Sequence, residues 1–264
     1  MPEAKKEQVL SVRDLDITFK TTAGPVHAIR GVNIDLYKGE TVALVGESGS
    51  GKSVTMKAAM GILAKNATVN SGSIRFSYHH ADGSPETVDL LQKDKKWIRR
   101  HINGKRIAMV FQDPMASLNP RKKVEDIIGE GLDIHHLCKT QAERREKVEK
   151  ILAKVGLAPE HAERYPHQFS GGQRQRVGIA RALIMNPKLI IADECISALD
   201  VSIQAQVVNL MKDIQQETGT AYLFIAHDLS MVKYISDRIG VLHLGHLLET
   251  GTTEEIFEHP IHPY

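Results

Sequence analysis

The sequence has little cysteine, few aromatic residues and almost no excess of charge of either sign. Its two cysteines, Cys138 and Cys195, have no metal-ligand spacing and form no disulfide framework, which is typical of a reducing compartment. The formal net charge of +2 is far from the basic excess that usually accompanies nucleic-acid binding. With 264 residues, of which 42% are hydrophobic, the chain is long enough to form one large globular domain.

Long apolar runs are also missing. The N-terminal stretch MPEAKKEQVLSVRDLDITF contains no apolar segment, so we expect no signal peptide. No run elsewhere approaches the length of a membrane span. We therefore expect any role at a membrane to depend on a partner protein.

Alternating patterns near the N-terminus predict an antiparallel sheet. Residues 9–19 and 31–40 alternate between apolar and polar side chains and end in turn residues. Residues 72–91 contain an Asp-Gly turn between strand-like flanks, which predicts a hairpin. The basic stretch 93–106 is interpreted as a solvated helix or loop, with an anionic membrane surface as the alternative.

Continuous apolar strands predict a parallel α/β core. Such strands are expected at TVALV, at RIAMVFQ ending at Gln112, at KLIIAD and at AYLFIAH. A helix after the third strand carries Ile203, Val207, Leu210, Met211 and Ile214 on one face and is expected to stop at Gly219. The stretch 238–251 predicts two final strands that turn at Gly245-His246.

A helical insertion, from about residue 113 to 168, separates two strands of this core. Thr140 and Glu143 have the spacing of a capping box at the start of one of its helices. The apolar face of that helix is predicted by the spacing of Val148, Ile151, Leu152 and Val155.

The stretch GESGSGKS, residues 46–53, matches the phosphate-loop pattern G-x-x-x-x-G-K-[ST]. Its glycines let backbone N–H groups converge on phosphate oxygens, Lys52 reaches the β- and γ-phosphates, and Ser53 is a ligand for Mg²⁺. A chance glycine-rich turn is the alternative. The position between an apolar strand and a helix disfavours that alternative.

Polar side chains end several of the predicted core strands, at the edge where open α/β sheets bind ligands. Asp193 is expected to hold the metal, and Glu194 to face the attacking water. His227 is placed to reach a γ-phosphate, and Gln112 to touch both metal and water. Phe19, near the end of an early strand, is a candidate to stack on an adenine ring, although a single phenylalanine is more often a core residue.

A second turn of phosphate-binding type, FSGGQ, opens a helix far from the first and contains no lysine. With its neighbours it makes the chain similar to the ATP-binding cassette family along almost its whole length. The matches are the phosphate loop, Gln112, the signature residues 170–173, the acidic pair 193–194, the stretch SALD and His227.

The resemblance implies an α/β fold with a P-loop NTPase (RecA-like) core, an N-terminal antiparallel β subdomain and an inserted α-helical subdomain, all within one domain, 1–264. It implies an ATPase in which Glu194, His227 and Gln112 are catalytic, and Ser53, Gln112 and Asp193 hold Mg²⁺. The residues implied to bind ATP are Phe19, Gly46, Glu47, Ser48, Gly49, Ser50, Gly51, Lys52, Ser53, Val54, Ser170, Gly171, Gly172 and Gln173.

Cassettes of this family pack head to tail, so that the signature turn of one chain caps the ATP held by the phosphate loop of the other. That arrangement explains the second turn, whose backbone N–H groups and helix N-terminus would serve the partner's nucleotide. The stretches FQDPMASLNP, SALDVSIQAQ and HPIHPY resemble the ATPases of oligopeptide and dipeptide importers.

The importer resemblance implies several partners. These are a second cassette that is usually a different chain, two transmembrane permease subunits and, indirectly, an extracytoplasmic solute-binding protein, with no nucleic acid. It places the chain at the cytoplasmic face of the cell membrane. Some members of the same importer group move nickel or glutathione. The resemblance therefore does not decide which solute is transported.

Two departures from the family pattern stand out. Cys195 follows Glu194 where the family normally has proline, which would fix φ and remove an N–H. The family usually continues past HPY with a tail that in some members carries a cysteine cluster for iron–sulfur, and this chain ends at Tyr264.

The sequence disfavours two other function classes. Cassettes that act on nucleic acid or ribosomes usually carry long coiled-coil insertions or two cassettes in one chain, and neither is present. A GTPase-like switch would need the guanine-reading pattern Asn-Lys-x-Asp after a strand, which is absent.

Overall fold

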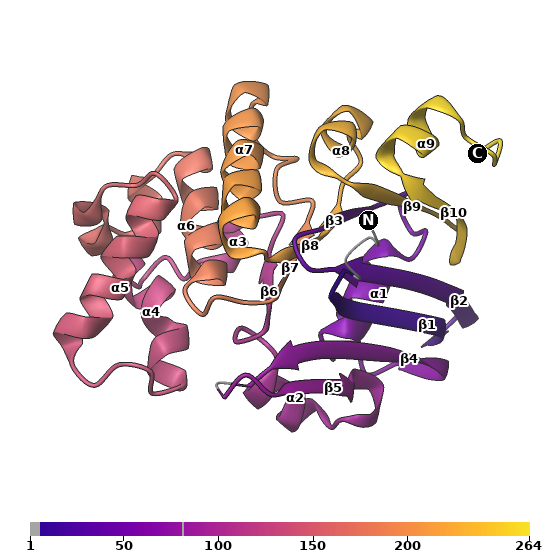
Figure 1. The fold of residues 1–264 in the computed structure, drawn as a ribbon, viewed down its shortest axis with the longest axis horizontal. Coiled ribbons are helices and arrows are strands. Elements are labelled where there is room, and N and C mark those ends of the chain that lie inside the picture. The colour runs from indigo at the N-terminus through magenta and orange to yellow at the C-terminus, as the bar shows by residue number, and fades with distance from the viewer. Residues whose placement is uncertain (1–5, 81) are drawn as a thin grey trace, which may run out of the picture.

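The computed structural model describes residues 6–80 and 82–264, which form two β-sheets with helices packed against them (Figure 1). The first sheet is antiparallel and four-stranded, in the order β2-β1-β4-β5. It confirms the predicted N-terminal sheet and the hairpin that turns through Asp82 and Gly83. Its strands are β1 (Gln8–Thr21), β2 (Gly24–Tyr37), β4 (Ala67–His79) and β5 (Pro85–Asp89).

The second sheet has six strands in the order β10-β9-β3-β8-β7-β6, and all are parallel except β10. The final hairpin turns at Leu244 and Gly245, one residue earlier than predicted, because both have positive φ, 46° and 86°. The strands are β3 (Thr41–Val45), β6 (Ile107–Val110), β7 (Leu189–Asp193), β8 (Ala221–Ile225), β9 (Arg238–His243) and β10 (His246–Thr252).

The parallel strands read as continuous apolar runs because both of their faces are buried. In β3, Val42 and Leu44 pack into a cluster shared with the first sheet, whereas Ala43 and Val45 pack into a cluster shared with the helices. Strands β7 and β8 alternate between the same two clusters. The sheet thus forms the middle layer of the molecule.

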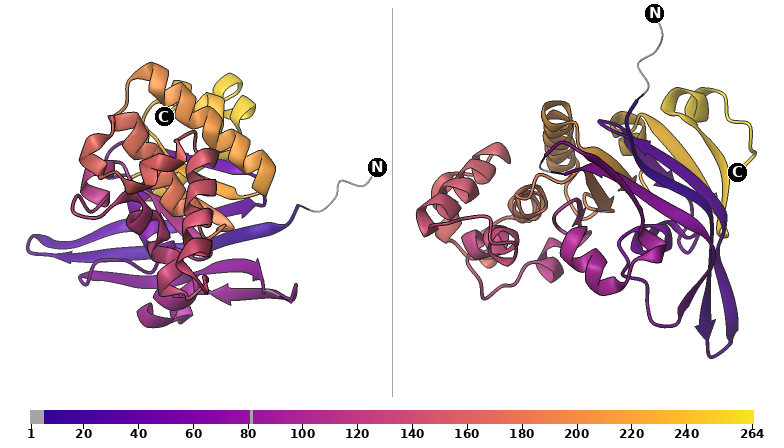
Figure 2. Two further views of the ribbon diagram at one scale, coloured as in Figure 1. Left: turned by 90° about the vertical axis from the view of Figure 1, so that its left-hand side faces the viewer. Right: turned by 60° about the horizontal axis from the view of Figure 1, so that its bottom comes forward.

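Helix α1 follows β3 and packs with both sheets. Helices α4 and α5 form one end of the molecule, and α6 joins that end to β6 and α7 (Figures 1 and 2). Helices α4 and α5 confirm the predicted helical insertion between β6 and β7. The limits of that insertion at residues 113 and 168 stay a prediction. The α-helices are α1 (Lys52–Ala59), α2 (Lys95–His101), α3 (Pro114–Ser117), α4 (Val124–Ile134), α5 (Gln141–Lys154), α6 (Gly171–Leu183), α7 (Val201–Thr218), α8 (Leu229–Ile235) and α9 (Thr253–Glu258), and 3₁₀ turns are η1 (Leu90–Gln92), η2 (Pro159–Glu163) and η3 (Pro166–Gln168).

Helix α5 has the predicted apolar face but only half of the predicted capping box. Thr140 Oγ1 accepts the N–H of Glu143 at 3.2 Å. The Glu143 carboxylate accepts the N–H of Lys139 at 2.9 Å, one residue before the position that a capping box requires. Val148, Leu152 and Val155 are buried, and Ile151 packs partly buried against them.

The basic stretch is helical in α2, which Asp94 caps by accepting the N–H of Trp97 at 2.8 Å. Only Ile98 of this helix is buried, so its charged side chains form the solvated face expected from the sequence. None of the helices in the described residues combines the length and the apolar character that a membrane crossing needs.

Helix α7 ends where the sequence predicted, at Gly219. Gly219 has φ +67°, a left-handed conformation that costs little for glycine but is unfavourable for residues with a Cβ. Its predicted face is buried at Val207, Met211 and Ile214, with Ile203 and Leu210 partly buried beside them.

Alanine substitutions at two glycines should change stability in opposite directions. Gly219→Ala should lower the free energy of unfolding by about 1 kcal/mol or more, because alanine is strained at that φ. Gly178→Ala, inside α6 where an added Cβ meets no atom within 4 Å, should raise it by about 0.4–1 kcal/mol. Urea unfolding measures the free energy of unfolding of both variants. A change in the same direction in the two variants would contradict the prediction.

Candidate functional site

The phosphate loop links β3 to α1, and two of its glycines, Gly46 and Gly51, are required by close contacts with the backbone. Gly46 has φ +143°, and a Cβ there would lie 1.9 Å from the carbonyl oxygen of Leu242. Gly51 has φ +109°, and a Cβ would lie 2.9 Å from the carbonyl oxygen of Ala28. Any side chain at either position would therefore displace the loop.

Lys52 is buried at the start of α1 and its ammonium group faces its own loop. The Nζ atom donates to the carbonyl oxygens of Gly46 at 2.7 Å and Glu47 at 2.8 Å. Burial lowers the pKa of Lys52, and the nearby carboxylates of Glu194 and Asp193 oppose that shift. The loop thus holds a cation where phosphate oxygens are expected to bind.

A cavity of about 150 Å³ joins this loop to two of the predicted catalytic residues. Glu194 and His227 line it from the ends of β7 and β8. The other lining residues belong to the loop and the start of α1, namely Ser48, Gly49, Gly51, Lys52, Ser53 and Val54. The structure therefore brings together side chains that the sequence separates widely.

Glu194 adopts an unusual backbone conformation, with φ +48°. Its N–H donates to the carbonyl oxygen of Ile225 at 2.9 Å, and its carboxylate contacts His227 Nε2. Alternation of side chains along a strand does not account for the different directions of Asp193 and Glu194. Strand β7 ends at Asp193, and the left-handed residue after it directs the second acid.

Asp193 is half-buried, and its pKa is raised by burial and then by the neighbouring Glu194 charge. A divalent cation would offset both effects. Within the described residues no group of three or more His, Cys, Asp or Glu side chains could hold a metal ion. The oxygens of Asp193, Ser53 and Gln112 suit Mg²⁺, which usually keeps waters and takes further ligands from substrate phosphates.

Gln112 lies beyond the end of its strand, because β6 ends at Val110. It is exposed, and its Nε2 atom lies 3.5 Å from Ser197 Oγ. Ser197 Oγ in turn donates to the carbonyl oxygen of Glu194 at 2.8 Å. Gln112 is therefore joined to the Glu194 turn through Ser197 rather than to the phosphate loop.

Phe19 lies on β1 and packs, partly buried, against the cluster shared by the two sheets. It pairs with Val26 on β2 and Ala67 on β4. Among the described residues, it is not one of those that line the phosphate-loop cavity. Its proposed stacking on adenine thus stays a prediction.

The signature turn lies at the start of α6, on the helical side of the molecule and away from α1 (Figure 1). Ser170 caps the helix: its Oγ accepts the N–H of Gln173 at 3.3 Å, and its own N–H donates to Gln173 Oε1 at 3.0 Å. Ser170, Gly172 and Gln173 line a second cavity of about 260 Å³ that shares no residue with the phosphate-loop cavity. One chain therefore holds the two turns apart.

Two further contacts at the site were not predicted from the sequence. Ser197 bridges Gln112 and Glu194, and its only sequence signal is its place in SALD. Tyr264 accepts a hydrogen bond from the Glu47 N–H across 217 positions of sequence, a separation at which no local pattern exists.

Comparison with known proteins agrees with this geometry. The family model described as "ABC transporter" matches residues 29–197. This chain belongs to the ABC transporter family. Membership confirms the expected fold and the ATPase class of this ABC cassette.

Among its curated relatives in the ABC family is the oligopeptide transport ATP-binding protein OppF of Bacillus subtilis, 53% identical over 98% of this chain and 80% of that protein. The dipeptide transport ATP-binding protein DppF of Lactococcus lactis is 52% identical over 100% of this chain and 80% of that protein.

Solved ABC structures show the same fold. The cassette CbiO1 of Clostridium perfringens, part of an ABC transporter complex, has a TM-score of 0.78 and 28% identity, over 96% of this chain and 92% of that one. The cassette MJ0796, a dimer bound to ADP and Pi, has a TM-score of 0.77 and 25% identity, over 92% of this chain and 98% of that one.

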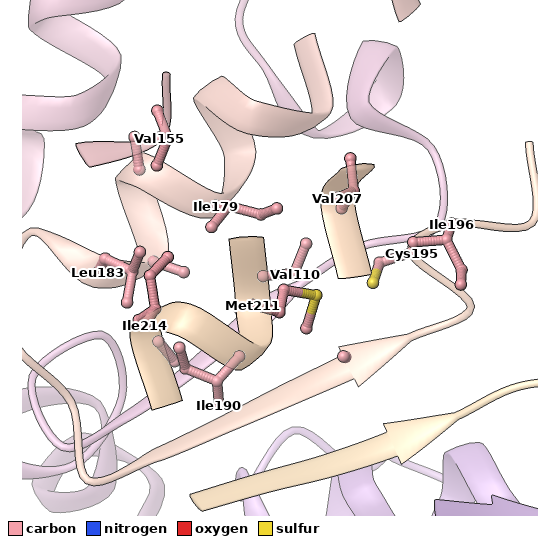
Figure 3. Packing of buried hydrophobic residues seen from close by; sticks show 14 of the residues in the cluster. Val110, Val155, Ile179, Leu183, Ile190, Cys195, Ile196, Val207, Met211 and Ile214 are labelled. Carbon is pink, nitrogen blue, oxygen red and sulfur yellow. The ribbon is translucent and has the colours of Figure 1, made fainter. Parts of the chain in front are cut away.

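Cys195, which follows Glu194, is buried in the cluster shared by the sheet and the helices, beside Val207 and Met211 of α7 (Figure 3). Burial raises the pKa of its thiol to about 12. At neutral pH the thiol stays protonated, and it behaves as a small apolar side chain next to Glu194.

Alkylation should therefore distinguish the two cysteines. In the folded protein at neutral pH, iodoacetamide should modify Cys138, which is partly exposed, and leave Cys195 unmodified, since only an accessible thiolate reacts. Both should react in denaturant. Peptide mass spectrometry measures the two sites, and rapid modification of Cys195 in the folded protein would contradict the burial described here.

Proposed function

We propose that this chain is the ATP-hydrolysing subunit of an importer for oligopeptides or dipeptides. The observation that carries the proposal is the cavity in which the phosphate loop meets Glu194 and His227, on the fold of an ABC cassette. The named relatives transport oligopeptides and dipeptides, which favours peptides over nickel or glutathione and a transporter over a ribosome or nucleic-acid enzyme.

Each residue of the site has a role in the proposed reaction. Lys52 and the loop N–H groups would bind the phosphates of ATP, while Ser53, Asp193 and Gln112 would hold Mg²⁺. When bound, the cation would supply positive charge to neutralise the phosphates. Glu194 polarises the attacking water. The contact between His227 and Glu194 supports a role for the imidazole in orienting that carboxylate, in addition to steadying the γ-phosphate.

The separation of the two phosphate-binding turns supports a head-to-tail dimer. Residues 170–173 would contact the γ-phosphate bound by the partner's loop, with the N-terminus of α6 directed at it. We propose that the partner is a second cassette of different sequence. Two transmembrane permeases would hold the pair at the cytoplasmic face of the membrane, and an extracytoplasmic binding protein would deliver the solute.

Glu194→Gln tests the catalytic role. The variant should bind ATP as the unchanged protein does. Its hydrolysis rate should fall by at least about 100-fold, because an amide does not polarise water as a carboxylate does. ATPase rate and uptake of a labelled dipeptide are measured on the assembled transporter. Hydrolysis near the unchanged rate would refute the role, and uptake of nickel or glutathione instead of peptide would refute the solute class.

Ser170→Arg tests the head-to-tail arrangement. The isolated chain should bind ATP with unchanged affinity, because Ser170 lies outside its own phosphate-loop cavity. In the dimer the bulky cation should displace the donors that face the opposite γ-phosphate, so that association and hydrolysis are lost.

Lys52→Ala is the matched comparison. It should weaken ATP binding by the isolated chain by about tenfold or more, since a charged hydrogen-bond donor to phosphate is removed. Titration of each isolated variant with ATP measures the two affinities that are compared. An equal loss of affinity in the two would show that residues 170–173 bind the ATP of their own chain.

A further inference from the structure

The segment after α9 runs past β10 and β9 to the phosphate loop. The Glu249 carboxylate on β10 accepts the backbone N–H groups of Ile261 at 3.0 Å and His262 at 2.8 Å. These two bonds lower the pKa of Glu249, so the acceptor stays ionised near neutral pH. Glu249 thus fixes the direction in which the chain leaves α9.

Tyr264 makes the contact with the loop itself. Its hydroxyl accepts the N–H of Glu47 at 3.2 Å. Its ring packs on His243 with centroids 4.4 Å apart, and its own N–H donates to His262 Nδ1 at 3.1 Å. The phenol is therefore held by β9 and by the segment before it, and not by the loop alone.

Lys52 holds the same part of the loop through its carbonyl oxygens. The Nζ atom binds the carbonyl oxygens of Gly46 and Glu47, while the Tyr264 hydroxyl binds the N–H of Glu47. Gly46 also packs against the carbonyl oxygen of Leu242. The first turn of the loop is thus fixed by contacts from α1, β9 and the C-terminal segment.

Apart from the Tyr264 ring on His243, this segment is held by hydrogen bonds rather than by close packing on the sheet. A cavity of about 420 Å³ separates it from the sheet, lined by Glu47, His227, Ile256, Phe257 and Tyr264 among others. The segment borders this cavity and is held by the Glu249 carboxylate, the His243 ring and the Glu47 N–H. Loss of the Tyr264 hydroxyl would remove its contact with the loop, and loss of the Glu249 carboxylate would weaken the hold on the segment that carries Tyr264.

We propose that Tyr264 is a positioning residue of the phosphate loop, which it holds in its nucleotide-binding conformation through the N–H of Glu47. A loop already ordered in that conformation loses less entropy when it binds a ligand, so the contact raises ATP affinity. The inference rests on the proposed function, because it assumes that the loop binds ATP. Tyr264 touches no reacting atom and acts only through the loop.

Tyr264→Phe removes the hydroxyl and keeps the ring on His243. It should weaken ATP binding by the isolated chain by about three- to tenfold, the range expected for one hydrogen bond. The assembled transporter should show a KM raised by a similar factor and an unchanged kcat. Tyr234→Phe is the matched control, since its exposed hydroxyl contacts Asn209 and not the loop, and it should change neither value.

A second measurement needs no nucleotide. Hydrogen exchange at the Glu47 amide should be faster in Tyr264→Phe and in Glu249→Ala than in the unchanged protein, and the same in Tyr234→Phe. Reciprocally, ATP should slow exchange in residues 259–264, because coupling between two sites acts in both directions.

The outcomes separate the two hypotheses. If the unchanged chain does not bind ATP, the proposed function fails, and this inference fails with it. If the unchanged chain binds ATP and Tyr264→Phe binds it equally well, only the positioning role is overturned. A reduced kcat with unchanged affinity, or unchanged exchange at Glu47, would also overturn it.

Discussion

Burial of both faces of the parallel sheet is the constraint on which the rest of the structure depends. Alternate residues of β3, β7 and β8 enter two separate apolar clusters, so a slip of one residue would exchange every side chain between them. The register of these strands fixes where each one ends. Because the strands are parallel, the phosphate loop, Asp193 and the approach to His227 lie at one edge of the sheet.

Much of this arrangement was predictable because its signals are local. Continuous apolar runs marked the buried strands, the glycine pattern marked the phosphate loop, and Gly219 marked the end of α7. The acids and His227 were found because each lies at, or within two residues of, the end of an apolar strand. The helical insertion was predicted from its periodicity. The Glu143 carboxylate, however, accepts the N–H of Lys139 instead of that of Thr140.

The remaining features depend on contacts between distant segments, which no local pattern records. The left-handed backbone of Glu194 is held by a hydrogen bond to Ile225 on another strand. Gln112 reaches the same turn only through Ser197, and Tyr264 reaches the phosphate loop only because β9 and β10 turn the chain back. Strand ends were predicted too late at Gln112 and His227 because apolar side chains continue past the last paired residue.

Two glycines of the phosphate loop, Gly46 and Gly51, and the nearby Gly245 each lie close to a main-chain carbonyl oxygen. Gly46 faces the carbonyl oxygen of Leu242, and both Gly51 and Gly245 face that of Ala28. Every amino acid supplies the same carbonyl oxygen, so evolution is free to exchange the residues at 28 and 242 within the limits of their own packing. The three glycines have no such freedom. We therefore expect positions 28 and 242 to vary among related sequences while the three glycines stay the same. The backbone of the neighbouring residues, rather than their side chains, preserves the shape of the site.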